Sequence, residues 1–519
     1  MIEETKGSQR RWIGLLFLGL SLLVIALDNT ILNLALPSIS DQLGASASQL
    51  QWIVDSYILV FAAMLLTMGS LGDRLGRKKL LQAGLLFFGI CSLAAALSTS
   101  TNMLIVSRAL MGLGGATIMP ATLSILTATF RDPKERAQAI ALWAATFALG
   151  AGIGPVIGGV LLDHFSWSSV FYINVPIVII AIIGDYFMIE NSKDEKVAKP
   201  DYPGVLLSIA GLFALVYGII QAGESSWGAN DVVASLISAA VLLSVFGWWE
   251  RRTPHAMLPF RFFKNMSFTG ANAALTLVMF SLFGSMFFLS QYLQSVLGYT
   301  PLEAGVRLLP MAFTSFLAAL MSARVAGFLG TKFTVAVGIL LAGSGMFYLS
   351  VVAQADSSYS TVLVGMCIAA LGIGTTMSPA TNSIMGALPV SRAGVGSAMN
   401  DTNRQVGGAL GVAILGTIMN ATYIDKVDHL KETNQMIAAL PHNAFEAIRS
   451  SIQGAQIVAQ HIPDPQLAQE IINTTSQAFT SGMKEGLLIG AIIMWIASFI
   501  TLLILPQRVR ASEEEKGAS

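Results

Sequence analysis

GSLGDRLGRKK, residues 69–79, joins two apolar runs of membrane-spanning length, Trp52–Leu71 and Leu80–Leu97. Gly72 and Gly76 allow a tight turn here, because glycine adopts backbone conformations that other residues avoid. Asp73 can pair with an arginine or accept hydrogen bonds at a helix N-terminus. The arginines and lysines of the same stretch are typical of short loops retained on the cytoplasmic side. The stretch therefore predicts a cytoplasmic turn between two transmembrane helices.

Similar apolar runs recur along the whole chain. Of the 519 residues, 54% are hydrophobic and 12% are charged, whereas a soluble domain carries roughly 25% charged residues. A bilayer core needs about 20 apolar residues per helix, and we expect fourteen spans. Twelve is the alternative, because the seventh and eighth runs are short or interrupted. The first run is too long for the apolar region of a cleaved signal peptide, so we expect it to remain as a span. The expected spans are Trp12–Leu36, Trp52–Leu71, Leu80–Leu97, Met103–Thr127, Ala137–Leu162, Val170–Ile189, Val205–Ile220, Val232–Trp249, Phe268–Leu293, Ala304–Val325, Phe333–Val352, Thr361–Met385, Val395–Asn420 and Leu487–Leu505.

Lysine and arginine orient these spans. Most of the 30 basic residues fall in alternate loops, and positive residues mark the cytoplasmic side of short loops. An even number of spans with both termini in the cytoplasm satisfies this alternation. The formal net charge of zero therefore carries no information about partners, and we expect no nucleic-acid partner. Both cysteines, Cys91 and Cys367, lie within apolar runs, which excludes a disulfide framework and a zinc site from the prediction.

The chain repeats itself. Residues 119–126 read MPATLSIL and residues 378–385 read SPATNSIM, so Pro120 and Pro379 stand 259 residues apart; the Arg-Ala pairs at 136–137 and 392–393 stand 256 apart. PAT is a common tripeptide, but a shared offset favours duplication over chance. The prediction is two parallel six-helix halves, 1–190 and 267–505, with a connector and two inserted helices at 191–266 and a cytoplasmic tail at 506–519. Parallel repeats place the substrate site near the midplane between halves. An extracytoplasmic loop, 421–483, contains the amphipathic stretch Phe445–Gln460, which could cap the outer mouth.

The loop at 69–79 closely resembles the signature G-x-L-x-D-R-x-G-R-K of the major facilitator superfamily. The matching residues are Gly69, Asp73, Arg74, Gly76 and Arg77. The resemblance implies a conformational latch that holds the cytoplasmic side closed. The second-half counterpart, residues 324–332, has Gly327 near the acidic position, so a second latch would be degenerate.

Residues 150–159 of the fifth span read GAGIGPVIGG. Pro155 removes a backbone hydrogen bond, and glycine permits close helix packing. Ordinary small-residue packing would explain this composition. The string is also similar to the antiporter motif of exporters in this superfamily, which matches Gly150, Gly154, Pro155, Gly158 and Gly159. That resemblance implies export.

LDNTILNLALP at 27–37, Arg108 with its following glycines, and NDTNRQVGG at 400–408 extend the resemblance. Together they resemble the fourteen-helix drug:proton antiporters, the EmrB/QacA-like multidrug efflux pumps. The expected fold is therefore all-α and integral to the membrane. The second half holds only two intramembrane acids, Glu303 and Asp401, which argues against divalent cations as cargo.

An ionisable side chain within a span is costly and is a functional candidate by default. Asp28, Asp55 and Arg108 all fall in the outer half by helical rise and could surround one cavity. Asp28 is the deepest acid and the expected proton-coupling residue. A static Asp28–Arg108 ion pair is the alternative. Asp55 is expected near the membrane surface, where a structural role is nearly as plausible.

The second-half charges have arginine neighbours at helical spacing. Glu303 precedes Arg307 by four residues, so the two share a helix face and satisfy each other. Asp401 and Arg404 stand three apart. We expect proton or substrate roles for Glu303, Asp401 and Arg404 only if these local pairs open.

The residues thus predict a secondary exporter and not an enzyme. No phosphate-binding loop of the G-x-x-x-x-G-K-[ST] type occurs, and neither cofactor nor metal is expected. The predicted function is exchange of protons for small amphipathic compounds, monovalent cationic or neutral, by a monomer in a bacterial plasma membrane. A narrow exporter of one metabolite or antibiotic, a lipid-precursor flippase and a non-transporting sensor are the alternatives.

Overall fold

The computed structural model describes residues 2–130, 132–190, 201–253, 260–387, 393–433, 435–438 and 440–507. The described chain is helical throughout, without strands. A helix satisfies all its backbone polar groups internally, which lipid requires of a spanning segment. The connector 191–200 and the tail from 508 lie outside the described residues.

The first six-span half follows the predicted order. Its helices are α1 (Ile2–Leu43), α2 (Ala47–Leu75), α3 (Arg77–Ala96), α4 (Thr101–Thr129), α5 (Pro133–His164) and the divided sixth span α6 (Ser169–Tyr172) with α7 (Asn174–Met188). α1 packs against α5 and α7, and α4 packs against both α2 and α3.

The last six spans pair in the same way. They are α10 (Met266–Gln291), α11 (Pro301–Leu329), α12 (Thr331–Val352), α13 (Tyr359–Gly386), α14 (Ala393–Thr433) and α18 (Pro465–Ile504). α10 packs on α14, α11 and α12 on α13, and α12 on α18, as α1 does on α5, α2 and α3 on α4, and α3 on α7. Gly76 (φ 108°) and Gly330 (φ 85°) make the turns after α2 and α11. Equal pairings and equal turns support duplication.

The inserted helices α8 (Tyr202–Glu224) and α9 (Asn230–Arg252) pack on each other, and α8 packs on α2 and α14. Thr417 of α14 donates to the Ile219 carbonyl of α8 at 3.0 Å. Thirteen described helices have membrane-spanning length and hydropathy. The remaining predicted span is α5, 32 residues long, whose described apolar stretch is Leu149–His164. The inserted helices count among the thirteen, which favours the fourteen-span prediction over the twelve-span alternative.

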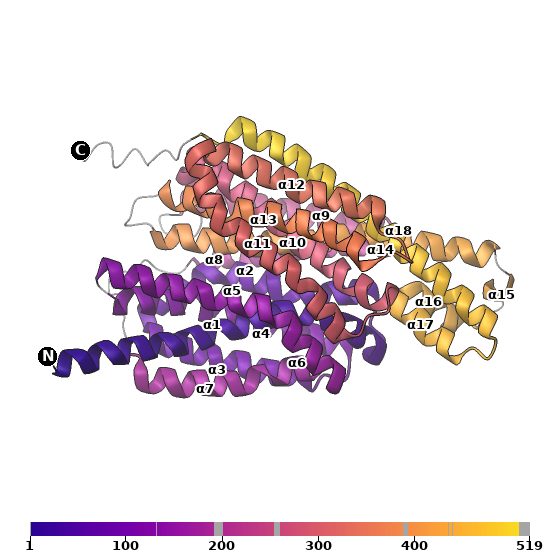
Figure 1. Ribbon diagram of the computed structural model, residues 1–519, viewed down its shortest axis with the longest axis horizontal. Coiled ribbons are helices and arrows are strands. Elements are labelled where there is room, and N and C mark those ends of the chain that lie inside the picture. Colours follow the sequence, from indigo (N-terminus) through magenta and orange to yellow (C-terminus); the bar gives the residue numbers. More distant parts are fainter. Residues whose placement is uncertain are drawn as a thin grey trace.

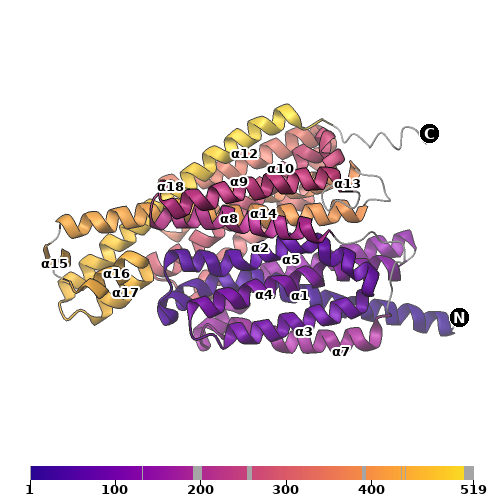
Figure 2. The same cartoon turned by 180° about the vertical axis from the view of Figure 1, so that it is seen from behind.

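The bundle has two distinct ends (Figure 1). We call the end where α1 begins and α18 finishes the terminal end. The opposite, loop end carries α15 (Gln435–Ala438), α16 (His442–Ser450) and α17 (Ile452–His461) between extensions of α14 and α18 (Figure 2). These two helices run past their predicted spans, α14 to Thr433 and α18 from Pro465. The predicted amphipathic stretch at 445–460 forms most of α16 and α17.

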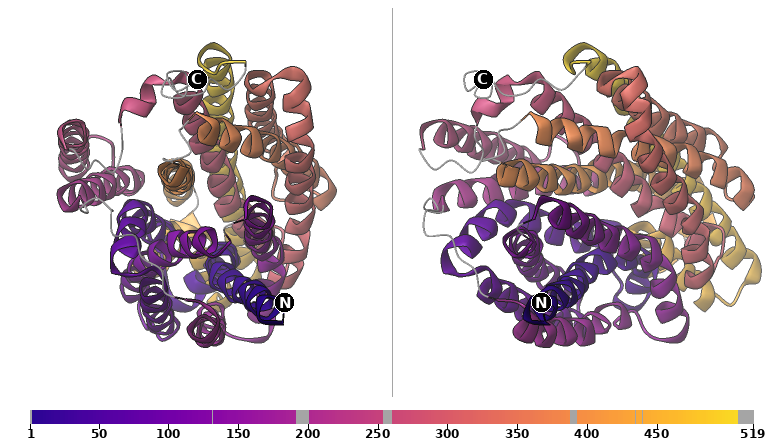
Figure 3. Two further views of the ribbon diagram at one scale, coloured as in Figure 1. Left: turned by 90° about the vertical axis from the view of Figure 1, so that its left-hand side faces the viewer. Right: turned by 60° about the vertical axis from the view of Figure 1, so that its left-hand side comes forward.

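The halves lie against each other along two helix pairs, α2 with α14 and α5 with α11. Seen along the bundle, the first half forms one side and the second half the other (Figure 3). A Cβ atom on Gly305 of α11 would overlap the Pro155 carbonyl of α5, and one on Gly159 would lie 2.5 Å from the Leu302 Cα. We call this contact the α5–α11 seam. Only glycine permits helices to approach this closely.

At the loop end, side chains of one half also reach backbone atoms of the other. Ser290 donates to the Asn33 carbonyl at 2.5 Å, and Gln294 donates to the Leu34 carbonyl at 3.0 Å. α17 adds contacts to both halves, because Ser451 lies 3.3 Å from Ser40 and Gln453 donates to Ser295 at 2.9 Å. The loop end is therefore closed by direct contacts between halves.

Candidate functional site

A buried ion pair joins α1 to α4. Nη1 of Arg108 lies 2.5 Å from Oδ2 of Asp28, and the two side chains are 1% and 2% exposed. Asn174 of α7 donates to the other Asp28 oxygen at 3.4 Å. The predicted meeting of Asp28 and Arg108 is thus a direct contact. Removing the charge of one member leaves the other member as an uncompensated buried charge. The remaining charge then needs another partner.

Arg108 has further partners that do not depend on Asp28. Its Nε donates to the Ile53 carbonyl of α2 at 3.2 Å, and its guanidinium carbon lies 4.2 Å from the centre of the Tyr57 ring. Ring faces attract cations, most strongly where water is excluded. Arg108 can therefore remain in place when Asp28 loses its charge.

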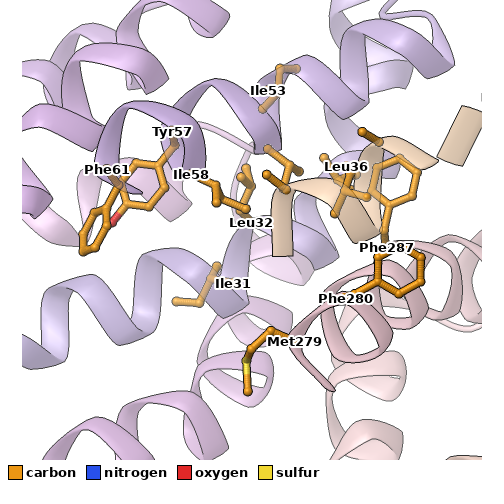
Figure 4. Packing of buried hydrophobic residues seen from close by; sticks show 14 of the residues in the cluster. Ile31, Leu32, Leu36, Ile53, Tyr57, Ile58, Phe61, Met279, Phe280 and Phe287 are labelled. Atoms are coloured by element: carbon orange, nitrogen blue, oxygen red, sulfur yellow. The ribbon is translucent and has the colours of Figure 1, made fainter. Parts of the chain in front are cut away.

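Glycines explain how Arg108 reaches α2. A Cβ on Gly112, one turn after Arg108, would overlap the Tyr57 carbonyl, and one on Gly115 would lie 2.7 Å from the Phe61 ring. The sequence after Arg108 thus brings α4 against α2. Figure 4 shows the apolar cluster beside them, with Ile31 and Leu32 of α1, Ile53 and Ile58 of α2, and Met279, Phe280 and Phe287 of α10. The residues of this cluster come from both halves.

Asp55 is buried within the bundle. It is 0% exposed, and neither carboxylate oxygen has a hydrogen-bond partner among the described residues. Gln51, one turn earlier on α2, lies against Gly416 of α14, while Asn420 donates to Ser48 at 3.5 Å. The predicted position near the membrane surface stays a prediction, and the structure adds that α14 packs on α2. Asp55 is a buried acid without a cationic partner in the described chain.

The second-half acids keep their local arginines. Glu303 and Arg307 form the predicted i, i+4 pair at 3.8 Å, at the loop end of α11. Asp401 of α14 is buried and interacts electrostatically with Arg404. Neither acid makes a described hydrogen bond to the Asp28–Arg108 pair. The structure therefore groups Asp28 with Arg108 and leaves the other predicted acids at separate positions.

The loop at 69–79 lies at the terminal end, between α2 and α3. Gly76 forms the turn, and Nη1 of Arg77 donates to the Ser124 carbonyl of α4 at 3.3 Å. Gly69 faces Pro120 of α4. The side chains of Asp73 and Arg74 lie outside the described part, so their predicted latch stays a prediction.

The glycine string of α5 has two packing faces. Cβ atoms on Gly150, Gly154 and Gly158 would crowd α1 at Ala26, Thr30 and Ile31. Pro155 and Gly159 face α11 across the α5–α11 seam. The string therefore sets the distance of α5 from the helix that carries Asp28 and from the opposite half.

Sequence reasoning missed three polar residues. Asn174 contacts Asp28, and Asp185 of α7 is fully buried and accepts a hydrogen bond from Ser21 of α1 at 3.3 Å. Asp163 ends α5 and accepts from the Leu302 amide at 3.2 Å. Applying the cost of intramembrane charge to the sixth span as well would have found Asp185. Asn174 and Asp163 carry no comparable signal.

Two sets of six spanning helices with the same pairings, one of which encloses a buried ion pair, are typical of a multi-pass secondary transporter. Residues 18–412 match the family model of the Major Facilitator Superfamily, and the chain belongs to that family.

The curated relatives are bacterial efflux and resistance proteins. The multidrug efflux pump LfrA of Mycolicibacterium smegmatis is 34% identical, over 96% of this chain and 97% of that protein. The tetracenomycin C resistance and export protein of Streptomyces glaucescens is 31% identical, over 95% and 91%. The methyl viologen resistance protein SmvA of Salmonella typhimurium is 32% identical, over 94% and 98%. These relatives match the drug:proton antiporter type that the sequence resembles.

Solved structures agree on the fold. A bacterial homolog of the human lysosomal transporter Spinster, in an inward-facing and unoccupied conformation, matches with a TM-score of 0.68 at 15% identity, over 96% of this chain and 98% of that one. A peptide transporter bound to sulfate matches with a TM-score of 0.60 at 14% identity, over 95% of each chain. At such low identity the likeness concerns the fold alone.

Proposed function

We propose that this protein exports small amphipathic compounds in exchange for protons. The buried Asp28–Arg108 pair carries the proposal, because it offers a carboxylate whose charge can change inside the membrane without losing its arginine. The names of relatives at 31 to 34% identity over most of the chain, which concern drug and antibiotic export or resistance, support this direction of transport.

The charge of Asp28 is the proposed coupling element. A proton that reaches Asp28 from outside neutralises the carboxylate, and Arg108 keeps the Ile53 carbonyl and the Tyr57 ring as partners. The proton leaves toward the cytoplasm when the opposite end opens, and the ion pair forms again. The substrate moves outward in the same cycle. One conformational change therefore carries the proton inward, and the reverse change carries the substrate outward.

The two ends of the bundle have proposed sides. The terminal end carries the basic loops and, by the positive-inside rule, faces the cytoplasm with both termini. The loop end then faces outward and is closed by the α5–α11 seam and by α17. The loop at 69–79, with Asp73, Arg74 and Arg77, is the proposed latch at the cytoplasmic side. Residues 421–483 are the proposed outer cap.

Asp55 is the proposed second proton-accepting acid. A fully buried carboxylate without hydrogen-bond partners is costly when charged, so a proton or a cationic substrate stabilises it. Asp55 lies on α2, one of the helices at the contact between the halves, so movement of the halves changes its surroundings. Asp401 and Arg404 on α14 would then act only after their local interaction opens.

The proposed substrates are monovalent cationic or neutral compounds. The proposed working unit is a monomer, which transports these compounds without changing them covalently. A narrow exporter of one antibiotic is the second candidate, favoured by the relative from Streptomyces glaucescens that is named for one compound. The number of different compounds that the protein exports distinguishes the two candidate functions.

Purified protein in liposomes with an imposed proton gradient tests the proposal. Cationic and neutral dyes should move against their own gradients, each with counterflow of protons, and a protonophore should stop both. Uptake that continues at full rate after the gradient collapses would contradict proton coupling. Coupling to a single compound among many would establish the narrow exporter.

A further inference from the structure

A guanidinium occupies an aromatic cage at the loop end. The Cζ atom of Arg307 lies 3.7 Å from the centre of the Tyr299 ring and 5.5 Å from that of Tyr359. The two rings stand at 90° to each other with centres 6.4 Å apart. The Glu303 carboxylate lies 3.8 Å from Nη1 of the same arginine. Two ring faces and one carboxylate are the groups that bind monovalent organic cations.

The cage walls are fixed without help from the guanidinium. Tyr359 donates its hydroxyl to the Arg307 carbonyl at 2.8 Å. Glu303 forms a capping box with Thr300, accepting from the Thr300 amide at 3.1 Å. Both hydrogen bonds involve backbone atoms, so they persist when the arginine side chain leaves the cage.

The guanidinium donates from Nη1 to the Glu303 carbonyl at 3.3 Å, but one of its donors is unsatisfied within the described chain. Its Nε atom is buried and has no hydrogen-bond partner among the described residues. An unpaired buried donor loses the hydrogen bond that water would supply. Arg307 is 27% exposed and Glu303 46%, so both are reached from the aqueous side of the loop end. A competing cation can enter while Arg307 turns toward water.

We infer that Tyr299, Tyr359 and Glu303 form a binding site for a monovalent organic cation, which Arg307 fills when no cargo is present. The inference rests on the proposed function, since it places a substrate-class cation on the exit side. Leu302 and Gly305, between and beside these residues on α11, pack against α5 in the α5–α11 seam. A cation leaving between the halves would thus meet the cage next to the seam it must open. One carboxylate limits the site to one positive charge.

Equilibrium binding of tetraphenylphosphonium to the purified full chain tests the site. Arg307→Gln removes the internal competitor, and we expect it to add one binding site per chain to those of the wild type. Adding Tyr299→Leu should weaken that extra site by roughly tenfold, the effect expected from losing one ring face. Glu303→Gln in the Arg307→Gln background should weaken it as well. Arg449→Gln is the matched control, because Arg449 also pairs with an acid, Asp428, at the loop end.

Thermal unfolding of each variant shows whether it remains folded. The inference is overturned if Arg307→Gln binds the same number of cations as the wild type. It is also overturned if the extra site keeps its affinity in both the Tyr299→Leu and the Glu303→Gln backgrounds. The proposed function is judged separately by proton-coupled flux in the wild type. An extra site in Arg307→Gln without such flux would support the cage and contradict the exporter.

Discussion

The carboxylate of Asp163, the penultimate residue of α5 in the first half, accepts a hydrogen bond from the Leu302 amide at the start of α11 in the second half, at 3.2 Å. The first turn of a helix has unpaired amides and a partial positive charge, so a carboxylate stabilises it. Two helices from different halves are thereby joined end to end at the loop end. Opening of this end must break that contact together with the close glycine packing below it.

Gly305→Val should destabilise the closed loop end and favour its opening. The added side chain would overlap the Pro155 carbonyl, and overpacking costs about 1 to 3 kcal/mol. Such an energy shifts a two-state equilibrium by roughly 5- to 150-fold. We expect the seam to separate, which distances between spin labels on α5 and α11 would measure.

Gly152→Val is the matched control for this substitution. Gly152 lies on the same seam helix, α5, yet a Cβ there meets nothing within 4 Å. Both changes place a β-branched residue at a helical glycine. Equal label distances in the two variants would show that the seam does not set the conformation.

Asp28→Asn and Arg108→Gln should each abolish proton-coupled efflux and each destabilise the protein. Removing one member of a buried ion pair costs about 3 to 5 kcal/mol. Arg108→Gln should be the more damaging, because Arg108 retains the Ile53 carbonyl and Tyr57 when Asp28 changes. Thermal unfolding and flux in liposomes measure the two effects.

The double variant separates a coupling role from a structural one. Asp28→Asn with Arg108→Gln leaves no unpaired charge, so stability should recover. Flux should not recover, because no carboxylate remains to carry the proton. Recovery of both would identify the pair as a static ion pair that merely orders the bundle.

Much of the fold follows from local patterns, whereas burial of the acids does not. The shared offset of residues 119–126 and 378–385 predicts the duplication that the helix pairings support. The i, i+4 spacing of Glu303 and Arg307 predicts their contact, since both lie on one helix face. Asp55 could not be placed in this way. Its burial depends on α14, more than 300 residues later in the chain, crossing the start of α2.

The same reason applies to the missed residues. Asp185 meets Ser21, which is 164 residues away, and Asn174 meets Asp28 at a separation of 146. Contacts between residues so far apart along the chain produce no periodic pattern in a single sequence. The glycines of α5 do leave one, because three of them recur every four residues and so share the face that packs on α1.

Asp55→Asn should stabilise the protein while reducing transport. The wild-type carboxylate is buried without a partner in the described chain, and an unsatisfied buried polar group costs about 1 to 3 kcal/mol, more when charged. An amide removes the charge. Thermal unfolding should therefore shift upward as flux falls. Unchanged flux would remove Asp55 from the proposed proton-accepting groups.

Asp73→Asn should slow transport of every substrate to a similar extent. The loop at 69–79 joins α2 to α3 at the terminal end (Figure 1), while the Asp28–Arg108 pair is buried between α1 and α4. A latch acts on the conformational change that all cargoes share. Initial rates for several dyes measure this, with Asp41→Asn, an exposed acid on α1 near the loop end, as control. Loss confined to one dye would indicate that the loop contacts cargo.

Export should favour monovalent cations over linked bis-cations. Asp28 already faces Arg108, Glu303 faces Arg307, and Asp401 interacts with Arg404. A dication needs two buried carboxylates, because one unpaired charge in a low-dielectric site costs several kcal/mol. Cells expressing the protein should therefore tolerate tetraphenylphosphonium better than methyl viologen, and a protonophore should remove the difference.

Equal, gradient-dependent export of both charge classes would contradict this preference. The second carboxylate would then be Asp55, the buried acid without a described partner, because Asp401 interacts with Arg404. Asp55→Asn would decide between them, since it should lower export of the dication further than it lowers export of the monovalent cation. Asp401→Asn in parallel, with protein levels measured for both, provides the comparison.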